Sequence, residues 1–213
     1  MSVKPETYFS VAQIANYELL DKKSRFIGAC APVKTVTEAQ EFIALAKTKY
    51  PDARHHCYAW IVQEEQRMER FSDDGEPQGT GGKPILDCLQ HAKLINVAVV
   101  VTRYFGGILL GTGGLTRAYG GCANETISRA GIVCYRLMRI YTVSCSYNLA
   151  EKVRFQLQKR GIWQEEATYL QEVSWQIALP ETQEEEITTV IADLTAGQAK
   201  LIKGDLQYMA SYN

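Results

Sequence analysis

The stretch from Phe71 to Gly121 carries the most informative pattern in this chain of 213 residues. It opens with Phe71-Ser-Asp-Asp-Gly-Glu-Pro-Gln-Gly-Thr-Gly-Gly-Lys-Pro84 and closes with Arg103-Tyr-Phe-Gly-Gly-Ile-Leu-Leu-Gly-Thr-Gly-Gly-Leu-Thr-Arg-Ala-Tyr-Gly-Gly121. Of the 16 glycines in the chain, 11 lie between Gly75 and Gly121. Glycine loses more conformational freedom on folding than any other residue, so a domain keeps it where backbone needs positive φ or a close approach. We therefore expect the functional site within this stretch.

The elements around this stretch indicate an α+β domain. Asn96–Phe105 contains the continuously apolar run Val-Ala-Val-Val-Val, which is typical of a central strand covered on both faces. Thr37 is expected to begin a helix, with Gln40 three residues later as its capping-box partner. Further helices are expected to start at Gly82-Lys-Pro84 and at about Thr112 or Leu115.

A second domain is expected to follow. From Leu137 the predicted elements come in the order β-α-β-β-α-β, which is the ferredoxin-like split βαβ pattern. One of these strands is predicted from Trp163 to Leu170. We therefore divide the chain into residues 1–136 and residues 137–213.

The bulk composition is that of an ordinary soluble protein, with 46% hydrophobic and 22% charged residues and a net charge of −1. Such a balance does not indicate nucleic-acid or membrane binding by the chain as a whole. The start of the sequence has no apolar leader region, and no run approaches the length of a membrane span. We expect a cytoplasmic protein that binds no membrane, with its six scattered cysteines as buried thiols.

Glycines immediately precede two predicted helix starts, in Gly79-Thr-Gly-Gly-Lys83 and in Gly111-Thr-Gly-Gly-Leu-Thr-Arg117. Free amide groups at a helix start, together with the close approach that glycine permits, can bind a phosphate. Lys83, Arg103 and Arg117 are nearby candidates for the counter-charge. Alternatively, the glycines only let the helices pack tightly. Neither segment matches the established glycine-rich nucleotide-binding patterns.

An acidic cluster, Asp73-Asp74-Gly75-Glu76, allows three interpretations. Three carboxylates in four residues could bind Mg²⁺ or Ca²⁺. They could equally cap the backbone of a tight turn, because Asp-Gly is a strong turn signal, or form ion pairs with Lys83 or Arg103. No cofactor is firmly indicated, and Mg²⁺ held by Asp73, Asp74 and Glu76 is the possible one.

His55 and His56 enter a strand whose alternation places them on opposite faces, which argues against joint chelation of a metal. Each could be a hydrogen-bonded structural group or part of a site. Cys57 beside them is not expected to be a nucleophile, because the residues on its face are small or apolar.

Aromatic and basic residues alternate in Arg103-Tyr104-Phe105 and in Arg117-Ala118-Tyr119. Aromatic faces beside guanidinium groups suit single-stranded nucleic acid, and the alternative is a core aromatic beside a surface arginine. The predicted anion or nucleic-acid site comprises Gly79, Thr80, Gly81, Gly82, Lys83, Arg103, Tyr104, Gly106, Gly107, Gly111, Thr112, Gly113, Gly114 and Arg117. The second candidate site comprises His55, His56, Asp73, Asp74 and Glu76.

With these residues the chain resembles the IMPACT family, of the bacterial YigZ type. The matching motifs are Pro51-Asp-Ala-Arg-His-His-Cys-Tyr-Ala-Trp60, the opening of the Phe71–Pro84 segment, and Arg103–Leu115 continued by Ala118-Tyr-Gly-Gly121. The resemblance implies an N-terminal domain like ribosomal protein S5 domain 2 and a ferredoxin-like C-terminal domain similar to the last domain of elongation factor G. It also implies a link to translation, because eukaryotic members are associated with translational control during amino-acid starvation. It supplies no catalytic residues.

Three functions remain open at this point. The first is a non-enzymatic protein that binds RNA, the ribosome or a translation factor. The second is an enzyme that binds a phosphate ligand such as a nucleotide, with Mg²⁺ at the acidic cluster. The third is an adaptor that docks a protein on the glycine-rich stretch. The sequence contains no motif that reads DNA sequence.

Overall fold

The computed structural model describes residues 5–211 and divides into two compact units. The N-terminal unit comprises residues 8–134, and the C-terminal unit comprises residues 135–211 together with Pro5–Thr7. Both units pack helices against a sheet, so the predicted two-domain α+β class is confirmed. No helix within residues 5–211 has both the length and the apolar character needed to cross a membrane.

The N-terminal unit is built on one five-stranded sheet, with antiparallel neighbours in the order β2-β3-β6-β4-β5. The strands are β2 (Ala15–Asp21), β3 (Ser24–Pro32), β4 (His55–Gln63), β5 (Arg67–Ser72) and β6 (Val97–Tyr104). The central strand is β6, and every residue from Val97 to Arg103 is buried. This confirms the prediction from its continuous apolar run.

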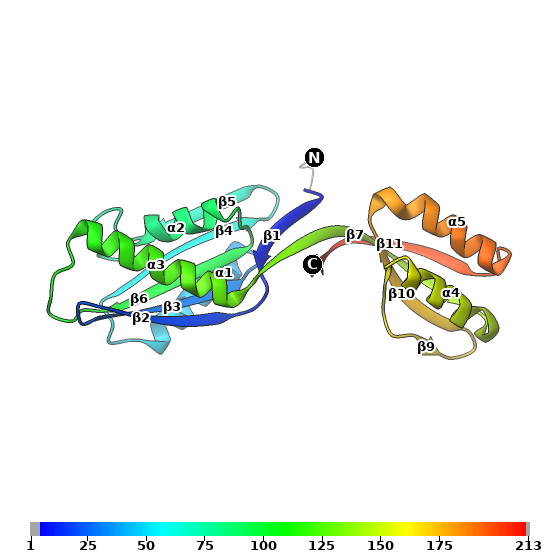
Figure 1. Cartoon of the computed structure of the whole chain (residues 1–213), viewed down its shortest axis with the longest axis horizontal. Helices are drawn as coiled ribbons and strands as arrows, with labels where there is room; N and C mark the ends of the chain where they lie inside the picture. Colours follow the sequence, from blue (N-terminus) through cyan, green and yellow to red (C-terminus); the bar gives the residue numbers. More distant parts are fainter. Residues whose placement is uncertain (1–4, 212–213) are drawn as a thin grey trace. The chain divides into compact units, whose positions relative to one another are not determined.

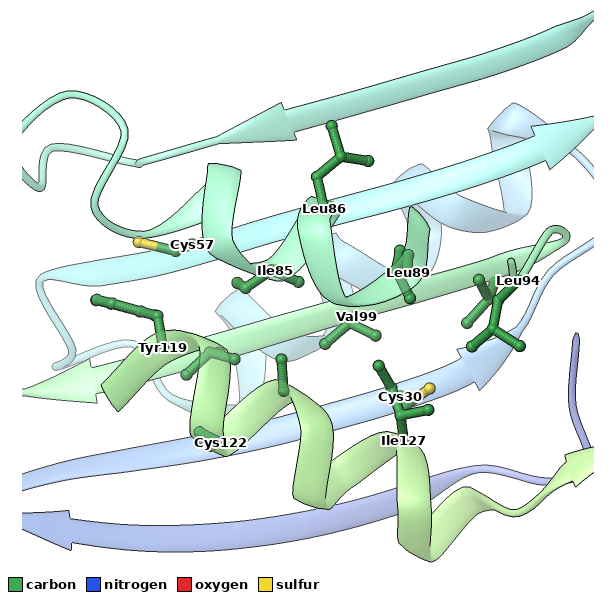
Figure 2. Close-up of a cluster of buried hydrophobic side chains, with 14 of the residues drawn as sticks. Cys30, Cys57, Ile85, Leu86, Leu89, Leu94, Val99, Tyr119, Cys122 and Ile127 are labelled. Carbon is green, nitrogen blue, oxygen red and sulfur yellow. The ribbon is translucent and has the colours of Figure 1, made fainter. Parts of the chain in front are cut away.

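Three helices cover this sheet. They are α1 (Val36–Lys49) on one face, and α2 (Gly82–His91) and α3 (Thr112–Ala130) on the other (Figure 1). Figure 2 shows Ile85 and Leu89 of α2 and Ile127 of α3 converging with Val99 of β6 in the core below α2 and α3. Burial of such aliphatic side chains supplies most of the free energy that holds helix to sheet.

The start of α1 corrects one prediction. Thr35, not Thr37, is the N-cap, and its Oγ1 accepts a hydrogen bond of 3.1 Å from the Glu38 amide. The Glu38 carboxylate in turn accepts a bond of 2.6 Å from the Lys34 amide. Thr35 and Glu38 together satisfy amides at the helix start, so the helix begins two residues before the predicted position.

The C-terminal unit has the predicted element order, and its sheet runs β11-β7-β10-β8. Its elements are β7 (Ile132–Cys145), α4 (Tyr147–Lys159), β8 (Trp163–Gln164), β9 (Thr168–Tyr169), β10 (Val173–Leu179), a 3₁₀ turn (Glu181–Gln183), α5 (Glu184–Thr195) and β11 (Lys200–Ser211). A further strand, β1 (Thr7–Val11), also pairs with β7, which passes from one unit into the other.

The strand predicted from Trp163 to Leu170 is interrupted. Gln164 pairs with Ile177 and Thr168 pairs with Ser174, so three residues on this strand face two on β10. The extra residue makes a bulge, which splits the strand into β8 and β9.

Candidate functional site

The antiparallel register gathers the predicted site residues at one end of the five-stranded sheet. His55 at the start of β4 pairs with Arg103 near the end of β6, and Arg25 at the start of β3 pairs with Tyr104. The connection from β5 to α2 and the connection from β6 to α3 leave from this same end (Figure 1). Segments that are far apart in the sequence therefore share one surface.

The start of α2 holds an internal anion, the carboxylate of Asp73. Its Oδ2 accepts from the Gly79 amide at 2.8 Å, and its Oδ1 accepts from the amides of Gly81 and Gly82 at 2.9 and 2.8 Å. The Thr80 amide donates to the Pro77 carbonyl instead. The amides expected to bind a phosphate are therefore already satisfied, which corrects the prediction for this helix start.

Close packing explains the glycines at the α2 start. A Cβ on Gly82 would lie 2.4 Å from the carbonyl oxygen of Ser72, and a Cβ on Gly81 would lie 2.4 Å from the Cys57 sulfur. Real Cβ atoms do not approach other atoms so closely, so both positions need glycine. Lys83, the expected counter-charge, forms an ion pair with Asp87 on the same helix.

Asp74 and the two histidines form a second hydrogen-bonded group. Asp74 accepts from the His56 amide at 2.8 Å and from Lys47 Nζ at 3.0 Å. Burial alone would raise the pKa of Asp74, but these two donors outweigh it and the pKa lies below its ordinary value. His55 Nδ1 lies 3.0 Å from the Asp74 carbonyl oxygen, and the buried His56 Nδ1 lies 3.0 Å from Thr102 Oγ1. Nδ1 of each histidine is thus held by an internal contact.

Glu76 is the centre of a buried network under the loop. Its Oε1 accepts from Arg103 Nη1 at 2.7 Å and from the Tyr119 hydroxyl at 2.8 Å. The side chains of Arg103 and Glu76 are only 6% and 4% exposed. The network joins the loop before α2 to the central strand and to α3, so it fixes the loop from below.

Arg103 is enclosed rather than presented to a ligand. Its guanidinium lies 5.4 Å from the Phe26 ring and 5.5 Å from the Phe105 ring, and Nη2 donates to Ser24 Oγ at 3.3 Å. A buried guanidinium between two rings and a carboxylate cannot reach a phosphate in solvent. The expectation that Arg103 supplies a counter-charge is corrected accordingly.

The three carboxylates of the acidic cluster do not converge. Asp73 caps α2, Asp74 bonds β4 and α1, and Glu76 pairs with Arg103. No group of three or more His, Cys, Asp or Glu side chains within residues 5–211 is arranged to hold a metal ion. This geometry does not favour the magnesium alternative.

Cys57 is inert. Its thiol donates to the Asp73 carbonyl at 3.0 Å, and it lies at the same end of the core as Tyr119 (Figure 2). Burial raises the pKa of the Cys57 thiol to about 12, so the thiolate is negligible at neutral pH. The six cysteines, all within the described chain, form no disulfide, and four of them are buried.

The start of α3 is different from that of α2. Gly111 is its N-cap with φ of 73°, and no side chain among the described residues caps this start. Thr112, Gly113 and Arg117 are exposed. A Cβ on Gly113 would lie 3.7 Å from the Arg117 guanidinium, so these two residues share one side of the helix.

The connection before α3 adds residues that the predicted site did not include. Phe105, Ile108 and Leu109 are 48%, 43% and 83% exposed. The exposed Lys22 and Lys23 lie in the β2–β3 turn, next to Gly106, whose Cβ would lie only 2.0 Å from Lys23 backbone atoms. The apolar run between glycines could have indicated an exposed loop. The position of the lysines beside this loop follows only from the fold.

The loops at this end carry a positive charge that the whole chain does not have. We name as the basic end residues 20–25, 47–55, 72–83 and 103–117. They contain nine lysines and arginines against five aspartates and glutamates, a formal charge of +4, compared with −1 for the chain. Five of its exposed cations form no ion pair with described residues: Lys22, Lys23, Lys49, Arg54 and Arg117.

Comparison with known proteins identifies the family. The IMPACT family member YvyE of Bacillus subtilis is 36% identical over 203 residues, which cover 95% of this chain and 94% of YvyE. The chain belongs to the IMPACT family. The model of the Impact N-terminal domain matches residues 22–127, and the model described as Domain of unknown function (DUF1949) matches residues 143–198. These two ranges fall in the two units of this IMPACT protein.

Two further relatives agree with this assignment. The IMPACT family member YigZ of Escherichia coli is 37% identical over 183 residues, covering 85% of this chain and 90% of YigZ. A crystal structure described as that of a hypothetical protein is 34% identical, covers 95% of this chain and 99% of its own, and has a TM-score of 0.62. The resemblance read from the sequence is confirmed.

Proposed function

We propose that this IMPACT-family protein regulates translation as a non-enzymatic protein that binds RNA, such as that of the ribosome, through its basic end. The observation that carries the proposal is the formal charge of +4 at the basic end, in a chain whose net charge is −1. Neutralising phosphates with lysine and arginine releases condensed counterions, and this supplies much of the affinity for nucleic acid.

The local arrangement supports this use of the charge. Three carboxylates at the basic end would repel phosphate, but each accepts a hydrogen bond from a group within the protein. They belong to Asp73, Asp74 and Glu76. The unpaired cations Lys22, Lys23, Lys49, Arg54 and Arg117 remain exposed. The basic end thus presents several positive charges to solvent that no ion pair offsets.

Family membership supports the link to translation. The IMPACT family implies translational control, and this chain matches a bacterial member over nearly all of its length. A binding role is also supported by the Cys57 thiol, whose pKa of about 12 keeps it protonated, and by the internal hydrogen bond that Nδ1 of each histidine makes. A binding role is therefore the function that the site supports best.

A cell-free translation system tests the proposal. Adding the protein is expected to change the yield of a reporter in proportion to its concentration, and the protein is expected to sediment with ribosomes at low salt. The triple variant Lys22→Gln, Lys23→Gln, Arg117→Gln should lose both effects, because it removes unpaired cations without touching the core.

The matched control is the double variant Arg67→Gln, Arg70→Gln. Both arginines are exposed on β5, and Arg67 lies at the opposite end of the sheet. It should behave like the wild type. If the triple variant and the wild type act equally, or if neither affects translation or sediments with ribosomes, the proposal fails. Association that survives nuclease treatment and high salt would identify a protein partner instead.

A further inference from the structure

We infer that the RNA bound at the basic end has unpaired bases, and that the connection from β6 to α3 contacts those bases. The inference rests on the proposed function and names the form of RNA that the same site selects. It is carried by an exposed apolar loop that lies among cations.

The loop has a chemistry unlike that of an ordinary surface connection. Residues 105–111 read Phe-Gly-Gly-Ile-Leu-Leu-Gly and contain no polar or charged side chain. Leu109 is 83% exposed, and Phe105 and Ile108 are each more than two-fifths exposed. Loops are normally polar, and a group of exposed large apolar side chains marks a contact surface.

Both ends of the loop are held in place. The Gly106 amide donates to Ser24 Oγ at 3.2 Å, and the backbone of Gly106 packs directly on Lys23. At the other end Leu110 packs against the core below α2 and α3. A contact surface that is already ordered loses less conformational entropy on binding than a flexible one.

Cations lie on both sides of the apolar tip. Residues 103–117 contain no aspartate or glutamate. Lys23 lies against Gly106, Lys22 precedes it in the same turn, and Arg117 lies one turn into the helix that follows. The Arg103 guanidinium lies 5.5 Å from the Phe105 ring, and Phe105 is still 48% exposed.

An unpaired nucleotide matches this combination of groups. It carries a flat, largely apolar base on a negatively charged backbone, so it can place the base on Phe105, Ile108 or Leu109 while its phosphates meet the lysines. In a duplex the base faces are stacked within the helix and cannot reach such a loop. Stacking on protein side chains is tolerant of base identity, so we expect selection for single strands rather than for a sequence.

The test compares a single-stranded RNA with a duplex of the same length, each labelled for fluorescence anisotropy. The wild type should bind the single strand roughly tenfold more tightly, as expected for one stacked base. The double variant Ile108→Ser, Leu109→Ser should lose most of that preference and keep its affinity for the duplex, because it leaves every cation in place. Phe105→Leu, which keeps an apolar group but removes the ring, should lose part of it.

The control is Ile14→Ser, which removes an exposed isoleucine, 66% exposed, beside the start of β2 at the other end of the sheet. It should bind both RNAs like the wild type. Equal binding of single strand and duplex by the wild type, with no change in the double variant, overturns this inference and leaves the proposed function standing. Failure of the wild type to bind either RNA overturns both.

Discussion

The starts of α2 and α3 share a sequence signature and differ in what they bind. Each contains a Gly-Thr-Gly-Gly segment, at residues 79–82 and 111–114, but α2 begins at the last residue of its segment and α3 at the second. At α2 the amides are buried and donate to the Asp73 carboxylate. At α3 no described side chain caps the start, and its first residues are exposed beside Arg117. The α2 start therefore stabilises the fold through internal hydrogen bonds, whereas the α3 start lies on the surface that we assign to RNA binding.

The difference shows that glycine before a helix has two separate uses. At α2 it allows backbone to pack on Ser72 at a distance that any Cβ would prevent. At α3, Gly111 adopts a φ of 73°, which few other residues tolerate, and turns the chain from the apolar loop into the helix. Substitutions near the α2 start should therefore change mainly stability, whereas substitutions at the α3 start should change mainly RNA binding.

Glu76→Ala should have the largest effect on stability. It leaves the Arg103 guanidinium buried without its carboxylate and removes the acceptor of the Tyr119 hydroxyl. Breaking one partner of a buried ion pair costs about 3–5 kcal/mol of unfolding free energy. Urea denaturation measures it. Glu76→Gln keeps an acceptor oxygen and should lose less, and equal losses for the two variants would contradict this account of the network.

Asp73→Ala should be the next most destabilising change, by about 2–4 kcal/mol, because it leaves several amides at the α2 start without an acceptor. Thr112→Ala, the matched change at the exposed α3 start, should cost less than about 0.5 kcal/mol. Thermal and urea unfolding of the two variants compare the starts directly. Similar losses at both would show that the starts do not differ as described.

Gly113→Glu should act in opposite directions on stability and on binding. Replacing a helical glycine and placing a carboxylate in the first turn should stabilise the protein by about 1 kcal/mol. The same carboxylate lies close to Arg117 and should weaken RNA binding by offsetting its charge. Gly113→Gln supplies the helix preference without the charge, so it should raise stability and leave RNA affinity near the wild-type value.

The smallest expected effect is a pH dependence of the free energy of unfolding, to which the segment before α3 does not contribute. Burial lowers the pKa of His56, so the unfolded chain takes up a proton more readily than the folded one. The free energy of unfolding should therefore fall as pH drops from about 7 through the ordinary histidine pKa of about 6.5. The lowered pKa of Asp74 adds a further loss near and below about pH 4.

His56→Gln should flatten the first of these slopes, measured by urea unfolding at a series of pH values. The segment 105–117 before and within the α3 start contains no His, Asp or Glu, so it should contribute nothing. An unchanged slope in His56→Gln would assign the pH dependence to other groups.

Local patterns in the sequence were enough to place most elements. The apolar run of β6, the alternation of β4 and the glycine-led starts of α2 and α3 all follow from local periodicity. The bulge between β8 and β9 could not be predicted, because it depends on pairing with β10. The α1 cap could have been found by weighing Thr35 and Glu38 against Thr37 and Gln40.

The roles of the site residues depend on contacts between distant segments. From the sequence, Asp73 and Glu76 could be metal ligands, backbone caps or ion-pair partners, and only the positions of Gly81 and Arg103 distinguish these roles. Arg103 lies near the end of a buried strand and was expected to reach a ligand, but the Phe26 and Phe105 rings enclose it. Lys22 and Lys23 join the site through the packing of Gly106, which no local pattern records.

The most direct test of the central claim is the salt dependence of RNA binding. The logarithm of the association constant should fall linearly with the logarithm of salt concentration, with a slope that counts the phosphates neutralised. For a single strand, the triple variant Lys22→Gln, Lys23→Gln, Arg117→Gln should have a slope shallower by about 2, and Arg67→Gln, Arg70→Gln should not change it. Identical slopes for the wild type and the triple variant would contradict the assignment of the basic end to RNA.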